Sequence, residues 1–155
     1  MLEAWLKCHD AIWELWWPSL RELGAEAERE VGGSFPSIRA TLGHMVWAEQ
    51  TWQARLEGAP TPAAVPASVA EAEAVWRSVA QRRSAYLADA DPKRLVAYER
   101  EGMRYENTVE EIVIHLITHA QFHRGQLASQ YRLLGRKPPS WHYINCFRQA
   151  RGFDG

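Results

Sequence analysis

Apolar residues recur at three- and four-residue intervals over most of the chain, the spacing of helices that bury one face. The first such segment spans 2–23 and contains Pro18, which predicts a kink or the start of a second helical piece. The second is expected to begin near Ser34 to Pro36, because serine caps a helix well and proline suits a first turn. It should end at Gly58.

Capping signals predict two further long helices. In each, a Ser or Thr stands three residues before a Glu, the signature of a capping box. The last long helix should end with Gly135 as its C-terminal cap. The predicted helices cover 68–90 and 108–134, with boxes formed by Ser68 with Glu71 and by Thr108 with Glu111.

The remaining segments have weaker helical signals. The stretch 59–67 carries three prolines and is expected to be a connection. Periodicity also weakens over 95–107, where Gly102 could turn a short hairpin, and a short helix is expected over Tyr143 to Arg148. Four long helices joined by short connections indicate an all-α antiparallel bundle with a helical tail, a single domain over 1–155 without an extended sheet.

Composition narrows the function classes. The chain has 155 residues, 46% hydrophobic and 24% charged, with a net charge of −1, and it lacks the basic stripe of a nucleic-acid-binding protein. It has neither the apolar run of a membrane span nor a signal-peptide pattern, so we expect a cytoplasmic protein. Cys8 and Cys146 lie at opposite ends without paired spacing, so we interpret them as reduced, structural thiols. The eight tryptophans are expected in the core and a dimer interface.

The histidine pattern is the main chemical signal. His119 and His123 are four residues apart, which places two imidazoles on one helix face, one turn apart. His44 lies beside the apolar stripe of the second predicted helix. A metal ion would satisfy all three rings, whereas ordinary hydrogen-bonded core histidines would need separate partners. Spacing alone leaves both interpretations open.

Three runs of sequence resemble the DinB/YfiT-like family of bacterial proteins. They are SFPSIRATLGHMVWAE over 34–49, HAQFHRGQL over 119–127, and LLGRKPPS over 133–140. The resemblance implies an up-down-down-up four-helix bundle, often dimeric, with a metal held by His44, His119 and His123. Near the tail many relatives have an aspartate where this chain has His142, so a role of the tail beside the site is not implied.

Most residues around the histidines have two possible roles. His115 could be a fourth ligand, although a supporting or core role is preferred. Glu49 could accept a hydrogen bond from an imidazole or pair with an arginine. Arg124 and Gln126 could face substrate or solvent, and Gly125 is expected to allow close helix approach.

The expected chemistry follows from three neutral nitrogen ligands, which leave a divalent ion with an open position. Zinc or nickel is favoured, and iron, cobalt or copper would also fit such a site. The resemblance implies a thiol S-transferase that joins a small-molecule thiol to an electrophile. The alternative is a non-catalytic metal-binding protein of the stress response, and a third reading is a metal that only pins two helices of a homodimer.

Overall fold

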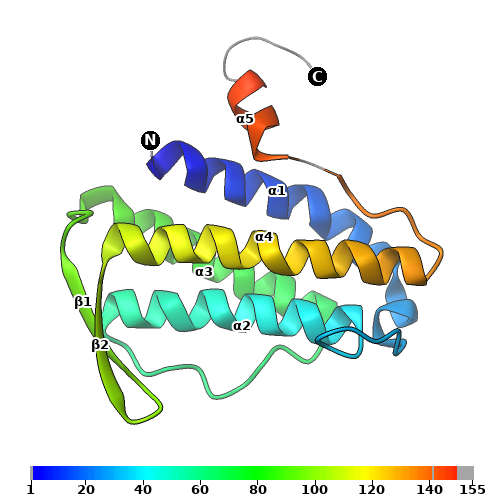
Figure 1. Cartoon of the computed structure of the whole chain (residues 1–155), viewed down its shortest axis with the longest axis horizontal. Helices are drawn as coiled ribbons and strands as arrows, with labels where there is room; N and C mark the ends of the chain where they lie inside the picture. Colours follow the sequence, from blue (N-terminus) through cyan, green and yellow to red (C-terminus); the bar gives the residue numbers. More distant parts are fainter. Residues whose placement is uncertain (1, 141, 150–155) are drawn as a thin grey trace.

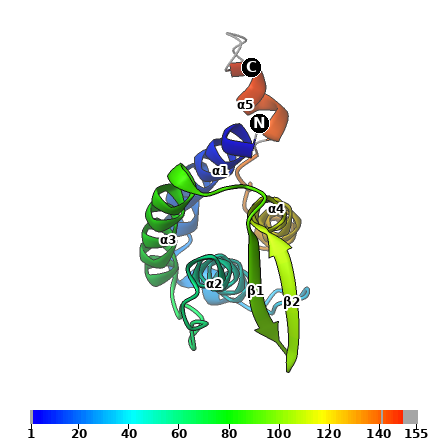
Figure 2. The same ribbon diagram turned by 90° about the vertical axis from the view of Figure 1, so that its left-hand side faces the viewer.

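The computed structural model describes residues 2–140 and 142–149, and its regular elements are helices and one hairpin (Figures 1 and 2). Four long helices lie side by side, and a short fifth helix lies outside them against the first (Figure 2). The mostly helical prediction is therefore confirmed. In chain order the elements are α1 (Leu2–Glu22), the 3-10 turn η1 (Gly24–Glu28), α2 (Ile38–Glu57), α3 (Val69–Asp89), β1 (Leu95–Arg100), β2 (Met103–Thr108), α4 (Val109–Leu133) and α5 (Tyr143–Gln149).

Most predicted helix ends are confirmed, and one start is corrected. Helix α1 continues through Pro18 as a single element. Helix α2 begins later than predicted, because Ser37 rather than Ser34 caps it, with its hydroxyl accepting from the Ala40 N–H at 3.2 Å. Gly58 ends the same helix in the left-handed conformation, with φ of 67°.

The two predicted capping boxes differ in outcome. Thr108 and Glu111 form the complete reciprocal box at the start of α4. At the start of α3, Ser68 accepts from the Glu71 N–H, but the Glu71 carboxylate accepts from the Ala67 N–H instead of that of Ser68. The helix therefore has its N-terminal cap without the reciprocal half of the box.

The hairpin suggested by Gly102 is present. Strands β1 and β2 pair antiparallel, with Tyr98 opposite Tyr105. Glu101 and Gly102 form the turn with φ of 54° and 76°, and two consecutive left-handed residues are what a tight two-residue hairpin requires. The hairpin extends from one end of the bundle alongside α2 and α4 (Figure 2).

Tryptophans fill the centre of the bundle, as expected. Trp13 and Trp17 of α1 stack with ring centroids 4.9 Å apart, and Trp76 of α3 lies within 5.8 Å of both. All three are at most 2% exposed. Large aromatic side chains contribute much of the apolar area that holds these helices together.

A buried carboxylate, Glu49 of α2, ties three helices together. It accepts hydrogen bonds from His9 Nε2 at 3.0 Å, Trp13 Nε1 at 2.7 Å and Arg83 Nη1 at 2.7 Å. Arg83 also pairs with Asp10. Burial favours the neutral form of Glu49, but His9 and Arg83 outweigh it, so the pKa of this carboxyl lies far below its usual value. Helices α1, α2 and α3 are thus joined through one buried carboxylate.

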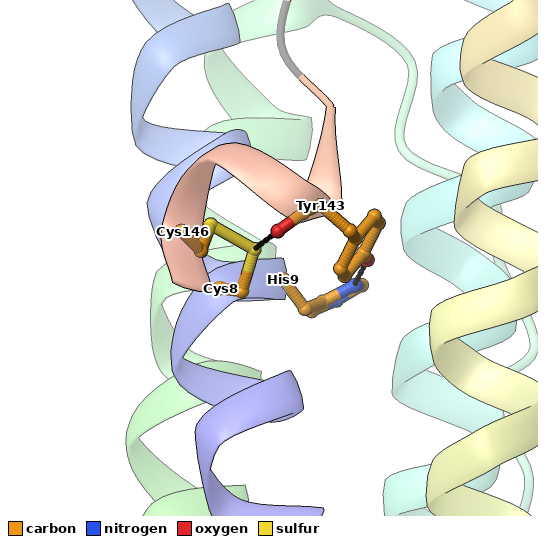
Figure 3. Close-up of a disulfide and its surroundings, with 4 residues drawn as sticks. All are labelled: Cys8, His9, Tyr143 and Cys146. Carbon is orange, nitrogen blue, oxygen red and sulfur yellow. Dashed lines mark hydrogen bonds between the residues drawn. A yellow bond between two sulfur atoms is a disulfide. The ribbon is translucent and has the colours of Figure 1, made fainter. Parts of the chain in front are cut away.

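The prediction of reduced cysteines is wrong in this structure. Cys8 of α1 and Cys146 of α5 form a disulfide, with their Cα atoms 5.8 Å apart (Figure 3). The tail folds back onto α1, and the Tyr143 hydroxyl lies 3.4 Å from His9 Nδ1 (Figure 3). The two cysteines are 138 residues apart, so no local spacing could indicate the pairing.

Among the described helices, none is long and apolar enough to cross a membrane.

Replacing Glu49 with Gln should lower the free energy of unfolding by about 3–5 kcal/mol, because Arg83 would lose a buried counter-charge. Urea unfolding followed by circular dichroism measures this. Glu28→Gln is the matched control: that carboxylate pairs with Arg39 at the surface, so its loss should cost no more than about 1 kcal/mol. Equal losses in the two variants would contradict the role assigned to Glu49.

Alkylation tests the disulfide. In the denatured, unreduced protein, neither Cys8 nor Cys146 should react with iodoacetamide, whereas both should react after reduction. The double variant Cys8→Ser, Cys146→Ser should be less stable by about 2–5 kcal/mol, since the bridge closes a very long loop. Mass spectrometry of protein trapped with acid directly from cells provides the measurement. Full labelling without reductant would show that the thiols are reduced, as a cytoplasmic location favours.

Candidate metal centre

Helices α2 and α4 lie next to one another and bring the three predicted histidines together. His44 comes from α2, and His119 and His123 come from consecutive turns of α4. The Nε2 atom of His119 lies 3.2 Å from that of His44 and 3.2 Å from that of His123. One ring nitrogen from each residue lies within 4.8 Å of the other two. Among the described residues, no other histidine, cysteine or acid joins this cluster.

The spacing of these nitrogens fits a metal better than hydrogen bonds. Nitrogens about 2.0–2.1 Å from one ion lie roughly 2.8–3.0 Å from one another in an octahedral arrangement and roughly 3.3–3.4 Å in a tetrahedral one. By contrast, a ring nitrogen carries either one hydrogen or one lone pair. The Nε2 atom of His119 could therefore satisfy only one of its two close neighbours by hydrogen bonding. A cation between the three satisfies all of them, so the residues present fit a divalent ion.

A glutamine fixes the ring orientation of His123. The Nδ1 atom of His123 donates to Gln126 Oε1 at 2.8 Å, and Gln126 Nε2 in turn lies 3.1 Å from the Ser34 hydroxyl. With the proton on Nδ1, the lone pair of neutral His123 is on Nε2, which faces the other two histidines. Gln126 is half-buried, so it has a role beyond the expected contact with substrate or solvent. It supports a candidate ligand.

Burial keeps the imidazoles of His44 and His119 in the form that binds metals. The pKa of His119 is lowered to about 4, first by burial and then by the neighbouring His123, His44 and His115. Burial, followed by the proximity of His123, also lowers the pKa of His44. Both rings are thus neutral near pH 7, so a cation would displace no proton from either of them.

Close packing surrounds the end of the site at the start of α2. The Phe35 ring stacks on His44 at a centroid distance of 4.7 Å. Gly43 adjoins the segment 59–67, where an added Cβ would lie 2.8 Å from a methyl carbon of Val65. Trp47 donates to the Pro62 carbonyl at 3.1 Å and so holds the same segment against α2. Gly43 is therefore the glycine that permits close approach beside the site.

The expectation for Gly125 is wrong. A Cβ added at Gly125 would meet no atom within 4 Å, so this glycine lies in open space. Arg124 also differs from expectation, because it points into the bundle and is only 4% exposed. Its guanidinium carbon lies 5.0 Å from the centre of the Trp13 ring. Burial lowers the pKa of Arg124, while Tyr143 and Glu49 partly oppose the change.

The other candidate residues lie outside the cluster. The His115 ring is one turn from His119, with centroids 5.5 Å apart, but it packs edge-on against Trp52. Glu49 does accept a bond from an imidazole and does pair with an arginine, but the imidazole is that of His9. His142 is exposed and does not join the three histidines. Sequence reasoning missed His9 and Arg83 because they are 40 and 34 residues from Glu49.

Metal occupancy tests the cluster. Replacing His119 or His123 with Ala should remove most bound metal, because two remaining nitrogens hold an ion weakly, whereas His115→Ala should retain it. Elemental analysis after dialysis against zinc or nickel measures the metal content, and a melting curve confirms folding. If His115→Ala loses metal while His119→Ala keeps it, the assignment of the ligands is wrong.

Comparison with known proteins agrees with this arrangement. A search of curated proteins found no match. The model of the DinB family matches residues 4–150, which is nearly the whole chain. The match spans α1 to α4, the hairpin and all three clustered histidines. This chain therefore belongs to the DinB family.

Proposed function

We propose that this protein is a metal-dependent S-transferase in which His44, His119 and His123 hold one divalent ion in an up-down-down-up bundle. The observation that carries the proposal is the cluster of three histidines between two helices, with one ring nitrogen of each within 4.8 Å of the other two. Three nitrogen ligands leave coordination positions open, which distinguishes a catalytic site from a closed structural one. Zinc or nickel is the favoured ion, with iron, cobalt and copper as further candidates.

The protein itself contributes nitrogen ligands and no nucleophile. A bound divalent ion would lower the pKa of a coordinated thiol, so that thiolate is available near neutral pH. Cys8 and Cys146 form a disulfide, and the described part of the chain contains no free thiol. The attacking sulfur must therefore come from a small-molecule cosubstrate. It forms a carbon–sulfur bond, the leaving group departs with its electron pair, and the thiol proton passes to solvent.

Exposure differs among the three histidines in a way that suits this reaction. His123 is 7% exposed and is held by Gln126, whereas His44 and His119 are half-buried. The cluster is thus anchored on one side and accessible on the other. A substrate could approach beside the half-buried rings without displacing the buried one.

A metal-binding protein of the stress response, without turnover, is the second candidate. It is favoured by the absence of a further acid or base in the cluster among the described residues. Assembly as a homodimer and a location in the cytoplasm are part of both proposals. Exposed apolar side chains on α1 and α4, Trp5, Leu15, Ile114 and Phe122, offer area for a second copy.

Thiol conjugation separates the two candidates. We expect the zinc- or nickel-loaded protein to accelerate the reaction of a low-molecular-weight thiol with chlorodinitrobenzene. Chelation should return the rate to that of the free thiol, because a smaller fraction of the sulfur would then be ionised. The release of chloride and the absorbance of the thioether are measured. His119→Ala should behave as the chelated protein, and His142→Ala, an exposed control, should keep full activity.

A loaded protein that gives no acceleration with any of several thiols would overturn the S-transferase proposal and favour the non-catalytic candidate. Melting curves with and without metal test the third interpretation, in which the metal only pins two helices. Such a metal must raise the melting temperature, so an unchanged melting temperature would exclude this interpretation.

A further inference from the structure

A cleft of about 360 Å³ lies one turn of α4 away from the three histidines, with His115 in its lining. It lies between the hairpin and helices α2 and α4, and its lining includes Trp52 and Arg55 of α2, Tyr98 of β1 and His115 of α4. The His115 ring links the two places, with its centroid 5.5 Å from that of His119 and 4.9 Å from that of Trp52. The volume is in the range of small-molecule sites.

The cleft contains a cation that is held without a counter-charge. The guanidinium carbon of Arg55 lies 4.3 Å from the ring centre of Trp52 and 4.4 Å from that of Tyr98, so two aromatic rings hold it. Its Nε is buried and has no hydrogen-bond partner among the described residues, and Arg55 makes no ion pair there. An arginine oriented in this way has its donors fixed before a ligand arrives.

The acids that line the same cleft are already engaged. The Glu111 carboxylate accepts from the Thr108 N–H at 2.9 Å and from the Asn107 amide at 3.0 Å, as part of the capping box. Glu101, at the tip of the hairpin, pairs with Arg100 at 3.1 Å. Among the described residues neither carboxylate forms an ion pair with Arg55, so an anion that enters the cleft would meet a guanidinium without an ion-pair partner.

We propose that this cleft binds the carboxylate of an elongated small molecule through Arg55, while the other end of that molecule reaches the ion held by His44, His119 and His123. Arg55 follows His44 by eleven residues, about 16 Å along α2, and its side chain lies over the turn of Trp52. Trp52 follows His44 by eight residues, about 12 Å along α2, and the bonds at the two ends of the ligand cover part of that distance, so the ligand itself must span roughly 10 Å. That the far end of the ligand contacts the ion rests on the proposed function.

The carboxylate that binds Arg55 could belong to the thiol or to the electrophile. Mercaptooctanoate and its neutral analogue mercaptooctanol probe the thiol in cobalt-loaded protein, through the absorption of a cobalt–thiolate bond. Chloromethylbenzoate and its methyl ester probe the electrophile, through KM in the conjugation reaction. Octanoate, added to metal-free protein and followed by calorimetry, probes the cleft without any metal chemistry.

Arg55→Gln should weaken octanoate binding about tenfold to a hundredfold, the worth of hydrogen bonds to a charged group. Arg82→Gln, which removes an arginine outside the cleft, should leave the affinity unchanged. Arg55→Lys keeps the charge without the planar fork and should bind octanoate with intermediate affinity. Circular dichroism checks that each variant is folded.

The effect of Arg55→Gln shows which substrate carries the carboxylate. Weaker binding of mercaptooctanoate, with mercaptooctanol unchanged, assigns the carboxylate to the thiol. A raised KM for chloromethylbenzoate, with its methyl ester unchanged, assigns it to the electrophile. Equal octanoate binding by Arg55→Gln and Arg82→Gln would overturn the cleft assignment. Mercaptooctanoate binding no tighter than octanoate in loaded protein would overturn the reach to the ion. Failure of the proposed function alone would abolish conjugation and leave the Arg55-dependent binding of octanoate.

Discussion

The buried Glu49 carboxylate is the constraint on which the arrangement of helices depends. Glu49 is 1% exposed, and a carboxylate buried to this extent is tolerated only when opposite charge and hydrogen-bond donors surround it. These come from His9 and Trp13 of α1 and from Arg83 of α3. Alternative registers of α2 would leave both the carboxylate and the Arg83 guanidinium unpaired. The network therefore selects one placement of α2 rather than adding much net stability.

That placement determines where His44 points. His44 precedes Glu49 by five residues, which on a helix turns the two side chains about 140° apart. With Glu49 directed at α1 and α3, His44 faces away from them, toward α4, where His119 and His123 lie. The same logic applies further along, because Arg55 follows His44 by eleven residues, about three turns, and so lies near the same face of α2, where it lines the cleft beside His115 of α4. The buried Glu49 carboxylate, on the inner face of α2, thus positions both the candidate metal centre and the aromatic cleft on the outer face of that helix.

Local sequence signals were sufficient for the helices, for the hairpin turn at Gly102 and for the identity of the three clustered histidines. Each of these depends on residues within a few positions of one another or on a motif in register with a known family. The His9 and Arg83 partners of Glu49 and the Cys8–Cys146 disulfide could not be predicted in this way. They join segments that are far apart in the chain, and their pairing depends on how the helices pack. Periodicity indicates which face of a helix is buried, without showing what that face meets.

The two glycines beside the histidines show the same limit at closer range. Gly125 follows the His119 and His123 motif, but the space around it is open, whereas Gly43 is needed because a connecting segment crosses α2 there. Nothing in the sequence of α2 shows where the segment 59–67 will lie. Similarly, Gln126 orients His123 because it lies one turn further along α4, on the same side, while Glu49 points to the opposite side of α2. Supporting residues are therefore better sought on the helix that carries the ligand than on the neighbouring apolar stripe.

The arrangement also separates what is fixed from what can vary in this site. The three histidines lie on α2 and α4, whose relative positions are set by the packed bundle and the Glu49 network. Two of the aromatic side chains that line the cleft, Tyr98 and Tyr105, belong instead to the hairpin, an element with one partner strand and few contacts to the core. Changes in the hairpin can alter the cleft without disturbing the nitrogens that would hold the ion. A bundle of this kind can keep one metal chemistry while the hairpin changes the molecules admitted to it.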